Sequence, residues 1–517
     1  MSVYSAVLKE LSMSYVDSIL VEEIISDNIA FMLKQLDPYT EYIPEDELPD
    51  FLLAATGEYT GIGADILSHK GQIFIAEPFD GMPAAAAGLQ VGDILTEING
   101  EKIDGRTADY IRKLLSGKPN TKVTIKFLRQ GDKKPRKVTI RRKRITIDPI
   151  TYYCVLPGNT GYICLSKFTT HSAQNLKAAF EDLKTNRGIA SLIIDVRNNG
   201  GGSLEDCLEI LNCFIPRGRI LMTEKGKDPK LNKTYRSAQD AIDTVIPLAI
   251  LVNRQSASAA EILAGSLQDW DRAIVIGSRT FGKGLLQISR KLPHKGQLKV
   301  TSAKYYIPSG RCIQAVDYAH HNNAGSISDL PDSPDLFFYT AKGRRVRGGG
   351  GVFPDFDAEE KGTPAILHQL ETENLFFEFV VQWQAKHPVD PPRIFTITNN
   401  IYNEFKNFLK SKSFTYTRQS EKAIGNLKNI LAAESDWELA AKEFNALEKQ
   451  MKSDLDHDMD FHKNRIVNVL GRQIMKRYYL SKGELIYSLR NDRSLNKALE
   501  MLSDRDLYLK TLASSNK

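Results

Sequence analysis

Four short apolar runs alternate with segments of helical pattern in the middle of the chain. The runs are GYICLSKF, ASLIIDVR, PLAILVN and RAIVIGS, and segments such as SLEDCLEILNCFI and SASAAEILAGSLQDW lie between them. A strand that is apolar on both faces has to be covered on both faces, and parallel strands joined by helices provide that cover. The alternation therefore predicts an α/β core around a buried sheet.

The regions on either side of this core have different textures. The start of the chain reads as helices that end at LDPYTEYIPEDEL, where Pro38 and Pro44 interrupt them. Short strands and turns follow, with GIGADI, QIFIAEP, GDILTEING and KVTIKFL as strands and DYIRKLLSG as one helix. Within the core, His320–Gly351 is rich in Asn, Asp and Gly and reads as a loop or linker. The predicted parts are a helical region at 1–50, a strand-rich domain at 51–145, the α/β core at 146–365 and a helical domain at 366–517.

Composition excludes several classes of protein. With 517 residues, 42% hydrophobic and 26% charged, the chain reads as two to four soluble globular domains. The net charge of +6 is small for this length, and the basic run KKPRKVTIRRKR alternates with β-branched residues. That pattern favours a solvated strand over a nucleic-acid surface. No stretch of about 18 apolar residues is present, so we predict no membrane span.

The metal-binding residue types form no recognisable site. The five cysteines contain no C-x-x-C pair and are expected to be buried small hydrophobes. The nine histidines are scattered, and neither His320-His321 nor Asp456…His462 has a spacing typical of metal ligands. We therefore expect neither a metal nor a cofactor.

The chain opens on SVYSAVLKELSMSYVDSILVEEI, an amphipathic helical pattern with acidic residues. A secretory leader has a basic start followed by an uninterrupted apolar stretch, which this segment lacks. If the protein is exported, we expect its leader to be missing from this sequence.

A near-match to a phosphate-binding loop occurs at GSRTFGKGLLQ, Gly277 to Gln287. The pattern G-x-x-x-x-G-K is present after an apolar run, but Gly284 stands where such loops use Ser or Thr to hold Mg²⁺. The following residues read as strands, whereas a phosphate loop needs a helix there. The sequence favours another role for Lys283, with a nucleotide hydrolase as the remaining alternative.

A candidate nucleophile lies in NRQSASAAEILAG, Asn253 to Gly265. Ser256 and Ser258 stand where a buried strand passes into a helix of small residues. A serine there has an exposed hydroxyl, and the first N–H groups of the helix face any negative charge formed beside it. The same residues also fit a capping box formed by Ser258 and Glu261. A capping box is an ordinary way for a helix to begin. Both interpretations stay open at this point.

Lysine can act as the base for a serine nucleophile. Its pKa must then fall from about 10.4 towards 7, a shift of roughly 4 kcal/mol that burial can supply. Lys283 lies between Phe281 and Leu285, which suits an enclosed lysine, although an ordinary surface lysine fits as well. The stretch IIDVRNNGGGS adds a loop whose free N–H groups suit an oxyanion, or a merely flexible turn.

Taken together, these motifs resemble the C-terminal processing (tail-specific) serine peptidases. The resemblance is carried by LDPYTEYIP, DVRNNGGG, NRQSASAAEILAGSLQD, GSRTFGKGLLQ, YYIPSGRCIQ and GGGVFPD, in this order, over about residues 1–360. It implies a mixed fold, α/β (α+β), with a crotonase-like peptidase core, an inserted PDZ domain and helical terminal regions.

The resemblance also implies roles for individual residues. Ser258 would be the nucleophile and Lys283 its general base, with Gln287 orienting the lysine. The backbone N–H groups of Ala259 and of a glycine in the GGG run, Gly202, would form the oxyanion hole.

The strand-rich segment from Gly57 to Arg144 resembles a PDZ domain, with MPAAAAGLQVGDILTEING supplying its small helix, turn and strand. The resemblance implies a carboxylate-binding loop whose N–H groups receive a free C-terminus, and the peptide would add to the sheet as an extra strand. The loop residues are Gly61, Ile62, Gly63 and Ala64.

The sequence thus predicts a serine endopeptidase with a Ser/Lys dyad that selects proteins by their C-terminal tails. The expected partners are polypeptides with free C-termini and a second copy or an adaptor protein, without nucleic acid. The resemblance implies a periplasmic or cell-envelope location. The alternatives are a PDZ scaffold with an inactive peptidase core and the nucleotide hydrolase.

Overall fold

The chain divides into two compact units, each assembled from separate stretches of sequence. Unit 1 comprises Met1–Tyr59, Thr146–Glu359 and Arg493–Lys517, and unit 2 comprises Thr60–Ile145 and Glu360–Asp492. The computed structural model describes residues 2–48, 51, 56–293, 296–321, 327–329, 336–358, 362–384, 387–434 and 437–513. The predicted boundary at Asp50 lies outside the described residues.

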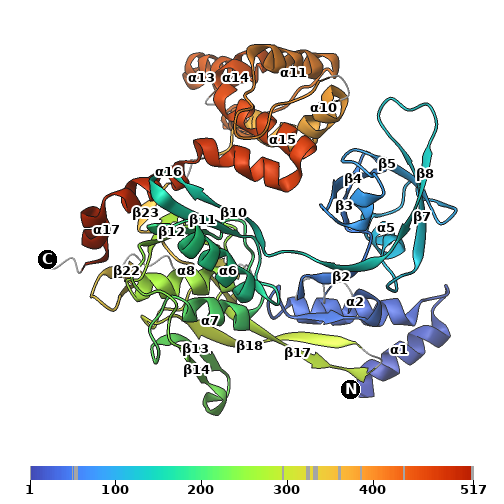
Figure 1. Cartoon of the computed structure of the whole chain (residues 1–517). Coiled ribbons are helices and arrows are strands. Elements are labelled where there is room, and N and C mark those ends of the chain that lie inside the picture. The colour runs from blue at the N-terminus through green and yellow to red at the C-terminus, as the bar shows by residue number, and fades with distance from the viewer. Residues whose placement is uncertain are drawn as a thin grey trace. The chain divides into compact units, whose positions relative to one another are not determined.

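A six-stranded sheet forms the centre of unit 1 (Figure 1). β10 runs antiparallel to β11, and every later pair in the sheet is parallel. The strands β12 and β15 are buried along their whole length, as their apolar sequences SLIID and LAILV require. The predicted α/β core is confirmed. In sheet order the strands are β10 (Ile150–Leu156), β11 (Thr160–Leu165), β12 (Ser191–Asp195), β15 (Leu248–Val252), β16 (Ile274–Gly277) and β23 (Phe356–Asp357).

Helices cover this sheet. α6 (Ser172–Glu181), α7 (Leu204–Asn212) and α8 (Ala259–Asp269) lie on one side of it, and α16 (Arg493–Ser503) lies on the other (Figure 1). α16 contacts β15 and β16, and α17 (Arg505–Leu512) contacts β16. The end of the chain, predicted to continue the preceding helices, therefore packs within unit 1.

A second sheet in unit 1 contains the strand that follows Lys283. β17 follows the lysine directly and pairs with β18. A strand at this point leaves the phosphate-loop alternative without the helix that it needs. The strands are β1 (Glu41–Ile43), β18 (Gln297–Tyr306), β13 (Ile220–Gly226), β14 (Lys233–Arg236) and β17 (Leu285–Lys291). The helices α1 (Ser2–Ser14) and α2 (Val21–Lys34) precede β1.

Unit 2 contains an antiparallel sheet in the order β3-β4-β5-β7-β8, with β6 beside β5. Its helix α5 packs Ile111 and Leu115 into the core of this sheet. The basic run predicted as a solvated strand forms β8, most of which is exposed. The elements are β3 (Ala64–His69), β4 (Gln72–Pro78), α4 (Pro83–Ala86), β5 (Ile94–Ile98), β6 (Glu101–Lys102), α5 (Ala108–Leu115), β7 (Lys122–Leu128) and β8 (Arg136–Arg141). The strands β2 (Glu58–Gly61) and β9 (Lys143–Thr146) pair with each other.

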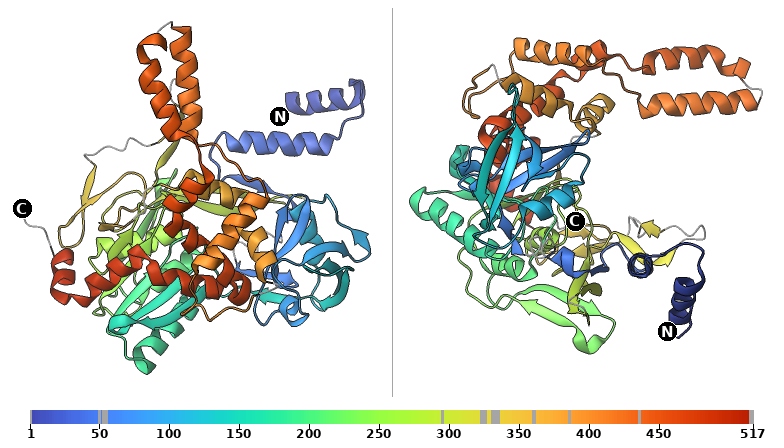
Figure 2. Two further views of the ribbon diagram at one scale, coloured as in Figure 1. Left: turned by 90° about the horizontal axis from the view of Figure 1, so that it is seen from above. Right: turned by 90° about the vertical axis from the view of Figure 1, so that its right-hand side faces the viewer.

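The rest of unit 2 is helical around an aromatic core that includes Phe376, Phe379 and Phe405. α12 and α13 pack against each other as a hairpin, drawn in orange in Figure 2. The helices are α9 (Ala365–Thr372), α10 (Leu375–Gln384), α11 (Asn399–Ser411), α12 (Gln419–Ala433), α13 (Trp437–Met451), α14 (Leu455–Phe461) and α15 (Lys463–Ser488). Among the described residues, no helix has both the length and the apolar character needed to cross a membrane.

The loop predicted from His320 to Gly351 is wrong in part. Phe337–Tyr339 (β21) pairs with Arg345–Arg347 (β22) as a short hairpin, because aromatic and β-branched residues flank a turn around Gly343. β20 (Ile327–Asp329) pairs with β19 (Val316–His321). Residues 322–326 and 330–335 of this predicted loop lie outside the described residues.

Candidate active site

Ser258 sits in a tight turn between β15 and α8. Its backbone has φ 57° and ψ −116°, whereas an ordinary N-cap residue is extended. The predicted capping box with Glu261 is present, but a cap alone does not require this conformation. Non-glycine residues held in rare backbone conformations concentrate at functional sites. The geometry of the turn therefore favours a role for Ser258 beyond capping.

Ser256, the other serine of this turn, is fully buried and structural. Its hydroxyl donates to Val196 O at 2.8 Å and accepts the Asn253 N–H at 2.9 Å. Because these bonds hold the turn to the neighbouring strand, Ser256 has no freedom to act as a nucleophile.

The carboxylate of Glu261 joins the Ser258 turn to the Lys283 loop. It accepts the N–H of Ser258 at 2.9 Å, the hydroxyl of Thr280 at 2.5 Å, and the N–H groups of Gly282 and Lys283 at 2.7 and 2.8 Å. Burial raises the pKa of this carboxyl group to about 7, and the four hydrogen bonds act in the opposite direction. The sequence showed Glu261 only as a helix cap, because its second set of donors lies about twenty residues further on.

The side chain of Lys283 is largely enclosed. Burial lowers its pKa from 10.5 to about 8, and the charge of Lys299 acts in the same direction. Its ammonium lies 4.5 Å from the centre of the Tyr39 ring, a cation–π distance. Within the described part of the chain, Lys283 Nζ donates no hydrogen bond to Ser258 Oγ. Tyr39 comes from LDPYTEYIP, so this motif contributes directly to the site.

Among the described residues, Gln287 makes no hydrogen bond to Lys283, the residue that it was predicted to orient. Its Nε2 donates to Leu285 O at 3.2 Å and to Thr301 Oγ1 at 3.1 Å. The register of β17 against β18 shifts between Leu286 and Gln287. This irregularity pairs the backbone of Gln287 with that of Thr301, which the sequence could not indicate.

The GGG run lies against the Ser258 turn. A Cβ at Gly201 would lie 2.7 Å from Ser258 Cβ, and one at Gly202 would lie 1.9 Å from Phe168 O. Both glycines have positive φ, 92° and 139°. Only glycine tolerates both a positive φ and the lack of space for a Cβ atom. The run therefore has a defined conformation in the site and is more than a flexible turn.

Two N–H groups in this region, those of Ala259 and Gly202, have no hydrogen-bond acceptor among the described residues. The Gly201 N–H, in contrast, donates to Asn199 Oδ1 at 2.9 Å. These are the two residues that the sequence predicted for an oxyanion hole.

Asparagine side chains fix the glycine loop to the serine turn. Asn198 N–H donates to Asn253 Oδ1 at 2.9 Å, and Asn253 Nδ2 donates to Asn198 Oδ1 at 2.8 Å. Asn199 O accepts the Ala257 N–H at 2.9 Å. The RNNGGG stretch thus supplies both the glycines and the bonds that place them. Sequence reasoning recognised the glycines and missed the asparagines.

In unit 2, the predicted carboxylate-binding loop connects β2 to β3. Ile62 O accepts the Ala84 N–H at 2.8 Å, and Gly63 O accepts the Phe79 N–H at 2.9 Å. In the described structure neither Ile62 nor Gly63 donates its own N–H. β3 is an edge strand of its sheet, so a peptide has room to pair with it. Gly61 and Ala64 lie at the adjoining ends of β2 and β3.

Comparison with known families gives three separate matches, and the 61–64 loop lies before the segment that matches a PDZ domain. Residues 159–320 match peptidase family S41. This segment runs from β11 into β19 and includes Ser258 and Lys283. The chain carries a peptidase S41 domain. Residues 74–129 match the PDZ domain, and residues 366–502 match the "Probable PDZ-protease, C-terminal helical domain".

Curated relatives agree with the S41 domain. A probable CtpA-like serine protease of Staphylococcus aureus (strain bovine RF122 / ET3-1) is 36% identical over 286 residues, covering 54% of this chain and 56% of the relative. The corresponding protein of Staphylococcus epidermidis (strain ATCC 12228 / FDA PCI 1200) is also 36% identical, with 57% of the relative covered. The chain thus spans little more than half the length of the curated relatives it matches.

Among solved structures, the photosystem II D1 C-terminal processing protease is 27% identical, with 69% of this chain and 87% of that chain covered. Its TM-score of 0.37 is too low to establish a common arrangement over the whole chain. Within the described residues, no group of three or more His, Cys, Asp or Glu side chains could hold a metal ion beside the S41 domain or elsewhere.

Proposed function

We propose that this protein is a serine endopeptidase that hydrolyses peptide bonds by acyl transfer to Ser258. Neutral Lys283 takes the proton of the Ser258 hydroxyl as its oxygen attacks the carbonyl carbon. The resulting oxyanion accepts hydrogen bonds from the N–H groups of Ala259 and Gly202. Lys283 then gives its proton to the leaving amine, and a water molecule hydrolyses the acyl-enzyme.

One observation supports this proposal most. The unusual turn at Ser258, the N–H of Ala259 and the Gly201–Gly202 loop converge in one place, and Glu261 joins this turn to the backbone of Lys283, whose pKa burial lowers to about 8. These are the parts that an acyl-transfer site requires. For the reaction, Lys283 Nζ has to leave the Tyr39 ring and reach Ser258 Oγ, with Gln287 orienting it in that arrangement.

We further propose that the PDZ domain selects substrates by their C-terminal tails. The unpartnered N–H groups of Ile62 and Gly63 would receive the terminal carboxylate, and the tail would pair with β3. Gly61 and Ala64 complete this loop. Because the PDZ and S41 domains share one chain, a captured tail raises the effective concentration of its own polypeptide near Ser258.

The proposed partners are polypeptides with free C-termini and, beyond these, a second copy of the chain or an adaptor protein. The proposed location is the periplasm or cell envelope. This location rests on the resemblance to the C-terminal processing peptidases alone, and fractionation of the source cells tests it.

Cleavage of a disordered polypeptide with an apolar free C-terminus tests the mechanism. We expect wild type to cleave it, Ser258→Ala and Lys283→Ala to lose at least a thousandfold in kcat, and the exposed control Lys304→Ala to retain activity. Amidation of the substrate C-terminus should weaken cleavage. Undiminished cleavage by Lys283→Ala overturns the dyad. If wild type leaves the substrate intact but binds its tail, the chain acts as a PDZ scaffold.

A further inference from the structure

The stretch YYIPSGRCIQ, Tyr305 to Gln314, has no role in the proposed reaction so far. It begins at the end of β18 and continues into the connection between β18 and β19. We call residues 305–314 the clamp segment. Its contacts with the Gly282–Gly284 backbone and with the far end of α8 show what it does.

Every backbone polar group of Gly282, Lys283 and Gly284 is hydrogen-bonded. Glu261 accepts the first two N–H groups, at 2.7 and 2.8 Å. The remaining four bonds come from the clamp segment and from Ala315, which follows it. Three consecutive residues with no free backbone group cannot shift without breaking several bonds at once.

Tyr305 holds the centre of this tripeptide. Its hydroxyl donates to Lys283 O, and its N–H donates to Gly284 O at 3.0 Å. The ring is 1% exposed, and burial raises the pKa of its hydroxyl well above the ordinary value, so it remains a donor. Tyr305 therefore holds the backbone of the proposed base, Lys283, and of the residue that follows it.

Gln314 holds the far side of the tripeptide. Its Oε1 accepts the Gly284 N–H at 2.7 Å, and its Nε2 donates to Val316 O at 2.9 Å. A Cβ at Gly284 would lie 2.6 Å from Gln314 N, so the segment approaches too closely for any other residue. Ala315 N–H donates to Gly282 O at 2.9 Å.

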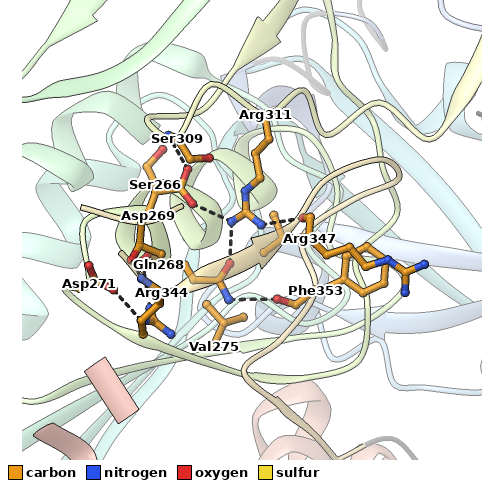
Figure 3. Close-up of polar contacts among 12 residues, drawn as sticks. Ser266, Gln268, Asp269, Asp271, Val275, Ser309, Arg311, Arg344, Arg347 and Phe353 are labelled. Carbon is orange, nitrogen blue, oxygen red and sulfur yellow. Dashed lines mark hydrogen bonds and ion pairs between the residues drawn. The ribbon is translucent and has the colours of Figure 1, made fainter. Parts of the chain in front are cut away.

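The middle of the clamp segment is anchored to α8, the helix that begins after Ser258. Arg311 is 1% exposed, and its Nη2 donates to Asp269 Oδ1 at 2.8 Å and to Gln268 Oε1 at 2.6 Å (Figure 3). Ser309 N–H donates to Asp269 Oδ2 at 2.9 Å. All residues of α8 are buried, so the helix fixes its two ends relative to each other.

We propose that the clamp segment positions Lys283 for Ser258: Tyr305 and Gln314 hold the lysine backbone, and Arg311 fixes the segment to the helix that follows the nucleophile. The inference rests on the proposed peptidase function. A β-hairpin requires the bond between Tyr305 N–H and Gly284 O, but it does not require the Tyr305 hydroxyl or the Gln314 amide. Tyr305 and Gln314 are positioning residues, since they act through Lys283.

Tyr305→Phe and Gln314→Met test this proposal, because each keeps the volume of the side chain and removes its polar group. The matched control is Tyr306→Phe, a neighbouring tyrosine whose ring lies under Lys225. We expect kcat to fall by about tenfold to a hundredfold with little change in KM. The pH at which activity is half-maximal should rise, because a displaced Lys283 becomes hydrated and gains proton affinity.

Amide hydrogen exchange of residues 281–286 gives a second measurement that needs no catalysis. Exchange should be faster in both variants and unchanged in Tyr306→Phe. Unchanged exchange and an unchanged pH profile overturn the proposal. So does a lower melting temperature accompanied by a wild-type pH profile, since this outcome indicates a structural role only. If the wild type cleaves no substrate but amide exchange is still faster in Tyr305→Phe and Gln314→Met, the clamp segment does hold the Lys283 backbone. In that case the proposed peptidase function is wrong.

Discussion

At the scale of single residues, glycine positions in the NNGGG run differ sharply in what they tolerate. Gly201 and Gly202 are enclosed, whereas a Cβ at Gly200 would meet no atom within 4 Å. The run therefore provides its own internal control, because one glycine is free to change while its neighbours are not.

We expect Gly202→Ala to abolish cleavage and to lower the free energy of unfolding by about 3 kcal/mol or more, through a backbone clash and a positive φ. Gly200→Ala should leave both quantities near wild type. Urea unfolding and cleavage rates check this prediction. Equal effects at the two positions would contradict it.

The pKa of Lys283 predicts the pH dependence of cleavage. Only the neutral amine accepts the serine proton, so kcat/KM should rise with pH and reach half its plateau near pH 8. Below that pH the lysine is protonated, and activity should fall about tenfold per pH unit. A profile that is flat from pH 6 to 9 would show that Lys283 is not the base, whereas a midpoint near 10.5 would show that burial does not lower its pKa in the reacting enzyme.

At the scale of elements, α8 and the loop before β17 depend on one carboxylate. Glu261 accepts four donors, two with each oxygen: Ser258 and Lys283 on Oε2, and Thr280 and Gly282 on Oε1. A glutamine has the same shape but presents N–H groups where one oxygen stood.

Glu261→Gln should therefore leave two buried donors facing another donor, at about 1–3 kcal/mol each. We expect a lower melting temperature and a large fall in kcat. Glu209→Gln on α7, an exposed position with one hydrogen bond to Gln239, is the matched control. Calorimetry of the two variants checks the prediction, which fails if Glu261→Gln unfolds like wild type.

At the scale of the whole molecule, the end of the chain packs within unit 1, the unit that contains the S41 match. The Tyr508 hydroxyl of α17 accepts the Leu248 N–H at 2.9 Å, at the start of β15. The same hydroxyl donates to the carbonyl oxygens of Leu248, at 3.2 Å, and Arg272, at 3.3 Å. A residue 260 positions away in sequence thus completes the hydrogen bonding of the central sheet.

Tyr508→Phe should leave the Leu248 N–H without an acceptor and lower the free energy of unfolding by about 1–3 kcal/mol. Tyr339→Phe, at a ring that is 63% exposed, should have no measurable effect. Denaturant titration of both variants decides the point. An unchanged Tyr508→Phe would mean that α17 contributes little to the sheet.

The PDZ loop gives a further prediction at this scale. Gly63 has φ 74°, and a Cβ there would lie 2.5 Å from Met82 Cβ. Gly63→Val should therefore distort the loop and raise KM for a substrate with a free tail. It should leave the turnover of a short internal peptide unchanged. If both substrates respond alike, the loop is not a tail-binding site.

Sequence patterns determined a great deal of this protein because their causes are local. Apolar runs between helical segments predict the α/β core. The strands and helices predicted on either side of DVRNNGGG and NRQSASAAEILAG are present in the structure. Ser258 and Lys283 stand out for the same reason, since a strand–turn–helix junction and a glycine-flanked lysine are visible in a short window.

Only the tertiary structure decided how these local pieces meet. Glu261 reads as a cap, yet it also binds the Lys283 loop, and Gln287 reads as a partner of Lys283, yet a register shift pairs it with Thr301. Tyr39 reaches Lys283 from the far end of the sequence. Sequence periodicity reports which face of an element is buried, but it carries no information about which distant donor meets a given acceptor. Such pairings follow from the packing of the complete chain.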